Sequence, residues 1–192
     1  MDMYDLLIQN GCIIDGTGTE GFIASIGIQS GKIVAIGDLC DSAANTIDAT
    51  GLTVTPGFID SHSHSDTALF ADPASIEKLE QGITTAIGGQ CGSSAAPARV
   101  AADQDVYKEG IGQKSQVYET AASFLDTMRN VPLGANHLCL IGAGNLRRMV
   151  LGMEQRNPTR DEMEQMKTML KDATRCAGYI LRSDIPALQL FH

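Results

Sequence analysis

Short apolar runs separated by glycine-containing turns fill the first 55 residues of the chain. We interpret each run as a β-strand; the runs are Tyr4–Ile8, Cys12–Ile14, Phe22–Ile28, Lys32–Ile36 and Thr46–Ile47. Ile26 and Ile28 alternate with small or polar neighbours, which is the two-residue period of a strand with one buried face. Asn10-Gly11 and Ser30-Gly31 are typical of tight turns between strands. The pattern predicts a small antiparallel unit.

After Pro56 the pattern changes to strands that alternate with helices. Three apolar runs are predicted to be buried strands: Gly57–Asp60, Ile83–Ile87 and His137–Ile141. Between and after them, helical spacing of apolar residues predicts three helices, at Ser75–Gln81, Glu119–Arg129 and Asn157–Cys176. Three strand–helix repeats indicate parallel βα units, so the predicted fold class is α/β.

The last helix carries the clearest signals. Pro158 stands at its start, and Thr159 with Glu162 has the spacing of a capping box. Met163, Met166, Leu170 and Ala173 fall on one face, which we expect to pack against the core. The polar stretch from Ser93 to Gln116 follows a strand end and is too long for an ordinary connection, so we expect a functional loop there.

Composition limits the class of protein. The 192 residues are 43% hydrophobic with a formal net charge of −9, which suits one globular domain, or one domain and part of another. Without clustered Lys and Arg, nucleic acid is not expected as a partner. No apolar stretch is long enough to span a membrane and no secretory signal is visible. Five irregularly spaced cysteines do not form a disulfide pattern, so we expect a cytoplasmic protein.

The strongest chemical feature is the segment Pro56–Asp66, which contains His62 and His64. Residues i and i+2 of an extended strand point to the same face, about 6–7 Å apart along the chain. Two neutral imidazoles placed in this way can bind one divalent cation such as Zn²⁺. The alternative is a pair of surface histidines in a serine-rich loop.

A second candidate is Cys91, in the glycine-rich turn that follows the strand Ile83–Ile87. If the two strands are parallel neighbours, Cys91 emerges at the same end as the histidines, where a thiolate is a good zinc ligand. The alternative is a small buried hydrophobic residue, which is what most free cysteines are.

A third feature is the turn Gly142-Ala143-Gly144, which leads into Asn145 and Arg147. Backbone N–H groups at such a turn can bind an anion. A simple tight turn with solvated arginines explains the sequence equally well. His137 begins its strand at the opposite end from the candidate site, so we expect no functional role for it.

These motifs resemble the amidohydrolase superfamily and, within it, the D-aminoacylase (N-acyl-D-amino-acid deacylase) family. The resemblance rests on the segments PGFIDSHSHSD, QGITTAIGGQCGSSAAP, LIGAGNLRRMVLG and NPTRDEMEQM. It implies that His62, His64 and Cys91 bind one or two Zn²⁺ ions, and that metal-activated water hydrolyses the amide bond of N-acyl-D-amino acids or similar amides. We also assign Asp66, Asn145 and Arg147 to the surroundings of the site, as residues that contact substrate or support the ligands.

The resemblance further implies a (β/α)₈ TIM-type barrel preceded by a small antiparallel β-sandwich portion. We expect residues 1–55 to form the sandwich portion and residues 56–178 the first three βα units. Residues 179–192 are expected to be an atypical, frame-shifted tail of a truncated chain. Since the expected general base lies on a later strand, no catalytic residue is assigned within this chain, and we expect it to be inactive alone.

Two other functions are consistent with the same residues. In the first, His62, His64 and Cys91 bind a structural zinc ion in a non-catalytic, metal-binding or partner-binding protein. In the second, the enzyme hydrolyses a cyclic amide, in the manner of dihydroorotase. The sequence around Cys91 favours the aminoacylase branch over the cyclic-amide branch.

Overall fold

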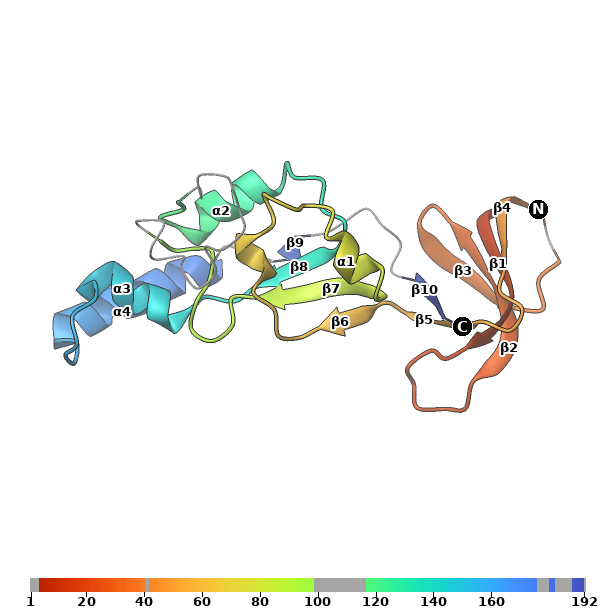
Figure 1. The fold of residues 1–192 in the computed structure, drawn as a ribbon, viewed down its shortest axis with the longest axis horizontal. Helices are drawn as coiled ribbons and strands as arrows, with labels where there is room; N and C mark the ends of the chain where they lie inside the picture. Colours follow the sequence, from red (N-terminus) through yellow and green to blue (C-terminus); the bar gives the residue numbers. More distant parts are fainter. Residues whose placement is uncertain (1–3, 41, 99–116, 176–179, 182–187, 192) are drawn as a thin grey trace. The chain divides into compact units, whose positions relative to one another are not determined.

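The chain forms two compact units in a computed structural model (Figure 1). The structure describes residues 4–40, 42–98, 117–175, 180–181 and 188–191. The first unit runs to Phe58 and also contains the strand β10 (Leu188–Phe191). The second unit begins at Ile59 and contains every described helix.

The first unit is built on a six-stranded sheet. Its strands are β1 (Tyr4–Ile13), β2 (Phe22–Gln29), β3 (Lys32–Gly37), β4 (Ala43–Asp48), β5 (Thr53–Pro56) and β10. β1 pairs antiparallel with β2, but β4 and β5 both pair with β1 in parallel. The sheet is therefore mixed, and the prediction of an antiparallel unit was wrong for β4; β5 was not predicted as a strand. Apolar periodicity shows that a segment is a strand and does not show which way its neighbour runs.

The two predicted turns of this unit have different outcomes. Ser30-Gly31 joins β2 to β3 as a hairpin, and both residues have the positive φ angles, 52° and 71°, of a tight two-residue turn. Asn10-Gly11 is no turn, because β1 continues through it. Asn10 has φ of 61°, and the register with β2 shifts between Ile8 and Gly11, so the pair forms a bulge.

The second unit is built on a four-stranded sheet with the order β6-β7-β8-β9. Its strands are β6 (Phe58–Asp60), β7 (Ile83–Gly88), β8 (Asn136–Cys139) and β9 (Ile180–Leu181). β6 and β7 point the same way in Figure 1, and β7 pairs with β8 in parallel. β9 pairs antiparallel with β8. The chain is thus an α/β protein with mixed sheets.

The predicted tail, residues 179–192, contains β9 and β10. The rest of that segment lies outside the described residues, as does the greater part of the predicted functional loop, at 99–116.

β6 is an exposed edge strand, although its apolar sequence predicted a buried one. The exposed fractions of Phe58 and Ile59 are 47% and 64%. Within the described part of the chain, β6 lies at one end of the strand order and has β7 as its neighbour. β7 alternates between buried and half-buried residues, with Thr84, Ala86 and Gly88 on the buried face.

The core of the second unit lies between the sheet and the helix α2 (Ala121–Met128). Phe124, Leu125 and Met128 are buried there with Leu69 and Cys139. Ala122, which the sequence placed on the packed face, is exposed, and Ala121 is buried instead.

Two further helices follow β8: α3 (Ala143–Leu151) and α4 (Arg160–Arg175). The capping box is confirmed, because the Thr159 N–H donates to Glu162 Oε2 at 2.7 Å and the Glu162 N–H donates to Thr159 Oγ1 at 3.3 Å. The predicted core-facing stripe is wrong in part. Ala173 is buried, but Met163 and Leu170 are 39% and 42% exposed. Among the described residues, no helix has the length and apolar character needed to cross a membrane.

Candidate metal centre

The two histidines lie just beyond the end of β6. The N–H of Ser63, between them, donates to the carbonyl of Ile87 in β7 at 3.0 Å. This bond holds the segment against the neighbouring strand. Ser63 is buried, while His62 is exposed and His64 half-buried. The chain bends at His62, and His64 has ψ of 21°, so the segment is not a regular extended strand; the two imidazoles nevertheless lie on the accessible side, with the buried Ser63 between them.

Cys91 lies in the turn that follows β7. It has φ of 54°, in the left-handed region, and it stands between Gly89 and Gly92, which also have positive φ. Its neighbour Gln90 donates from Nε2 to the carbonyl of Ser61 at 3.0 Å. This hydrogen bond ties the cysteine turn to the histidine segment, so the two strand ends are linked by more than the sheet.

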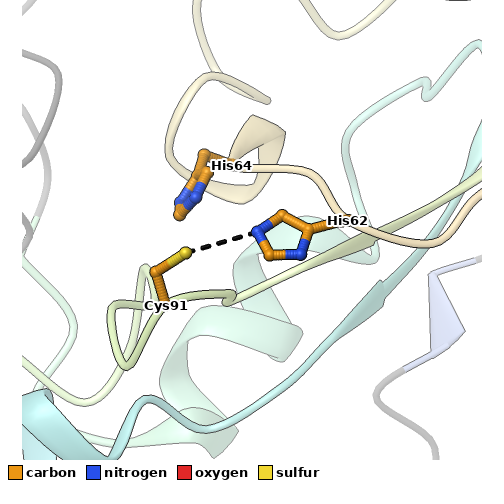
Figure 2. Close-up of side chains that lie close together, drawn as sticks. All are labelled: His62, His64 and Cys91. Atoms are coloured by element: carbon orange, nitrogen blue, oxygen red, sulfur yellow. Dashed lines mark hydrogen bonds between the residues drawn. The ribbon is translucent and has the colours of Figure 1, made fainter.

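The three side chains converge, as Figure 2 shows. His62 Nε2 lies 3.3 Å from Cys91 Sγ, and the ring centroids of His62 and His64 are 5.8 Å apart. One donor atom from each of the three residues lies within 4.8 Å of the others. The predicted convergence of His62, His64 and Cys91 is thus what the structure shows.

This donor set fits a divalent cation. With Zn–N near 2.1 Å and Zn–S near 2.3 Å, tetrahedral coordination keeps nitrogen and sulfur donors about 3.5 Å apart. The distance between His62 Nε2 and Cys91 Sγ is close to that value. Imidazole and thiolate together are borderline-soft donors, which favour zinc over magnesium or calcium.

Asp66 follows the histidine pair but is turned into the protein. Only 1% of it is exposed, and its Oδ2 accepts a 2.7 Å hydrogen bond from the Ala95 N–H. Burial raises the pKa of this carboxyl above its ordinary value, while hydrogen bonds from the Ala95 and Gly89 backbones oppose the change. Asp66 therefore fastens the loop after the cysteine turn, and its assignment to the surroundings of the site stays a prediction.

Asn145 has a similar place. It is fully buried; its Oδ1 accepts from the Ser94 N–H at 3.0 Å, and its Nδ2 donates to the carbonyls of Ser94 and Pro97, each at 2.9 Å. These hydrogen bonds join α3 to the loop beyond Cys91. Asn145 therefore supports the loop that follows Cys91, and its assignment to the surroundings of the site stays a prediction.

The turn Gly142-Ala143-Gly144 packs backbone to backbone against the cysteine turn. The Gly144 N–H donates to the Gly92 carbonyl at 2.9 Å, and the Gly142 N–H donates to Ser94 Oγ at 3.0 Å. A Cβ at Gly142 would lie only 2.5 Å from the Gly92 oxygen. These two N–H groups are therefore occupied, and the structure favours a tight supporting turn over an anion site.

Arg147 supports a different region. Its guanidinium donates to the carbonyls of Glu154 and Arg156, in the connection between α3 and α4. The assignment of Arg147 to the surroundings of the site stays a prediction.

The supporting roles of Gln90 and Ser94 were not predicted from the sequence, although both residues lie in the glycine-rich segment that follows β7. The role of Lys78 was not predicted either; its Nζ lies 2.8 Å from Asp60 Oδ2. The hydrogen bond from Lys78 lowers the pKa of the Asp60 carboxyl. His137 is fully buried on β8, and burial, with the charge of Lys78, lowers its pKa to about 4.

Comparison with known proteins places these features in a family. Residues 45–188 match the model of the amidohydrolase family. The chain is 40% identical over 174 residues to D-aminoacylase from Alcaligenes xylosoxydans xylosoxydans, covering 88% of this chain and 35% of the relative. The chain thus spans about a third of the length of the curated relatives that it matches.

Solved structures of related deacylases are also similar to this chain. The N-acyl-D-glutamate deacylase from Bordetella bronchiseptica, complexed with zinc and a phosphonate inhibitor, is 35% identical with a TM-score of 0.82. This match covers 91% of the present chain and 37% of the deacylase. A D-aminoacylase structure is 36% identical with a TM-score of 0.81, covering 88% of this chain and 36% of that enzyme.

Proposed function

The chain belongs to the amidohydrolase family, and we propose that it carries part of the metal centre of an N-acyl-D-amino-acid deacylase. The observation that carries the proposal is the convergence of His62, His64 and Cys91 from two neighbouring strand ends, with their donor atoms within 4.8 Å. Cys91 distinguishes this donor set from other metal sites, because a histidine pair alone is common to many of them.

Each residue has a defined part in this proposal. His62 and His64 bind the cation through neutral imidazole, and Cys91 binds it as a thiolate. A bound divalent cation polarises an amide carbonyl and lowers the pKa of bound water to about 7. His62 and Cys91 are both exposed, so a substrate can reach the donors from solvent. Gln90, Ser94 and Asn145 hold the cysteine turn in place.

The fold proposal is finer than the observed α/β class. We propose that β6, β7 and β8 are the first three strands of a (β/α)₈ barrel and that the first unit is part of a β-sandwich. The parallel pairing of β7 with β8 and the similarity to D-aminoacylase support this arrangement. The boundaries at residues 55 and 178 belong to the same proposal.

The proposed substrate class is N-acyl-D-amino acids, and the proposed metal is zinc. Relatives named D-aminoacylase, N-acyl-D-aspartate deacylase and N-acyl-D-glutamate deacylase support the class. The zinc in the Bordetella structure and the donor set of this chain support the metal.

Metal binding is the first test. We expect the 192-residue chain to bind zinc, and the Cys91→Ala variant to bind it at least about tenfold more weakly. Cys40→Ala is the matched control, since Cys40 is also an exposed free cysteine. Equal zinc affinity in the Cys91→Ala and Cys40→Ala variants would refute the proposed centre.

Hydrolysis is the second test. A chimera replaces the matching segment of the Alcaligenes D-aminoacylase with this chain, and release of the free amino acid is measured. We expect the chimera to hydrolyse N-acetyl-D-amino acids faster than their L-enantiomers. The Cys91→Ala chimera should lose this activity. The present chain alone should show no turnover. A folded, zinc-loaded chimera that does not hydrolyse these amides would favour a non-catalytic metal site.

A further inference from the structure

A sheltered ion pair lies next to the histidine segment. Lys78 Nζ is 2.8 Å from Asp60 Oδ2, and the two side chains are only 13% and 24% exposed. Asp60 is the last residue of β6, and Lys78 lies in the short helix α1 (Ile76–Leu79). Sheltering makes such a pair stronger than an ordinary surface ion pair, because water screens it less.

The carboxylate of Asp60 joins Lys78 to the first histidine. While Oδ2 accepts from Lys78, Oδ1 accepts a 3.3 Å hydrogen bond from the backbone N–H of His62. The position of the His62 backbone is therefore linked through one carboxylate to an ammonium group on another element.

The helix that carries Lys78 is itself fixed. Ser75, which precedes α1, is buried and its N–H donates to Asp72 Oδ1 at 3.2 Å. In contrast, β6 is short and its residues Phe58 and Ile59 are exposed, so its side chains bury little surface, and hydrogen bonds have the larger part in holding the histidine segment.

We propose that Lys78 is a positioning residue for the metal-binding histidines, acting through Asp60. The ion pair fixes the end of an exposed edge strand, so His62 is held near Cys91 before a cation binds. Cation binding then costs less conformational entropy. This inference rests on the proposed function of the site, although its effect on the backbone of His62 does not require a metal.

The test compares Lys78→Met with Lys167→Met. Lys167 forms an ion pair of the same length, 2.8 Å, with Glu164, but both partners are 62% exposed. We expect Lys78→Met to weaken zinc binding about tenfold and to weaken the cobalt–thiolate absorption of the Co²⁺-loaded chain, while Lys167→Met changes neither. Lys78→Arg, which keeps the charge, should retain most of the affinity. Urea unfolding of each variant checks that the fold persists.

A second readout uses the metal-free chain. Amide hydrogen exchange at His62 should be faster in Lys78→Met than in Lys167→Met. Equal exchange and equal zinc affinity in these two variants would overturn the proposal, as would failure of Lys78→Arg to restore either. If the unsubstituted chain bound no zinc, the proposed function would fail, and the exchange rates would still decide the role of Lys78.

Discussion

Asn145→Ala is the substitution that best tests how the cysteine turn is supported. The fully buried amide makes three hydrogen bonds with backbone groups, namely the Ser94 N–H, the Ser94 carbonyl and the Pro97 carbonyl. Its Oδ1 also accepts a 3.1 Å hydrogen bond from the Arg148 guanidinium. Alanine removes these bonds and leaves the three backbone groups buried without them.

The expected loss follows from these contacts. A hydrogen bond contributes about 1 kcal/mol net, and a buried group left unsatisfied costs about 1–3 kcal/mol. Three bonds therefore predict a loss of about 3–5 kcal/mol in the free energy of unfolding. This is a large part of the roughly 5–15 kcal/mol of a typical domain.

Urea unfolding of the chain measures the loss, and amide exchange at Ser94 and Gly144 locates it. Asn130→Ala is the control, since the Asn130 side chain is exposed and donates one 3.3 Å hydrogen bond to Asp126. We expect less than about 0.5 kcal/mol from the control. If Asn145→Ala costs no more than Asn130→Ala, the interpretation of Asn145 as a support for this loop is wrong.

Two further predictions concern other buried or capped groups. The pKa of His137, lowered to about 4, lies below its unfolded value, so its contribution to stability is complete above about pH 6.5 and is lost as pH falls toward 4. The loss reaches about 3 kcal/mol. Urea unfolding across this pH range should show that the free energy of unfolding falls less steeply with decreasing pH in His137→Leu than in the unsubstituted chain. Equal slopes in the two proteins would contradict this role of His137. Thr159→Ala should destabilise α4 by about 1 kcal/mol, because it removes the capping hydroxyl. Thermal unfolding measures the loss, with the mid-helix variant Thr168→Ala as the control. Equal melting temperatures of the two variants would exclude the capping role.

Local signals in the sequence predicted local structure correctly. The Ser30-Gly31 hairpin and the Thr159–Glu162 capping box depend on residues at most three apart, so their geometry is specified by nearby sequence. The convergence of His62, His64 and Cys91 was also predicted, because the ends of neighbouring parallel strands meet at one edge of a sheet.

Pairing and packing between distant segments were decided only by the tertiary structure. The parallel pairing of β4 with β1 and the buried roles of Asp66 and Asn145 all depend on partners many residues away. The ion pair of Lys78 could not be predicted from the local sequence, because its partner Asp60 is 18 residues earlier. The sequence by itself determined which residues have donor groups and indicated most of the strands and helices, although β5 was not predicted and β1 was predicted as two strands. Only the folded chain decided which donor groups converge at one place and which are hydrogen-bonded to distant backbone groups, because that depends on how distant segments pack.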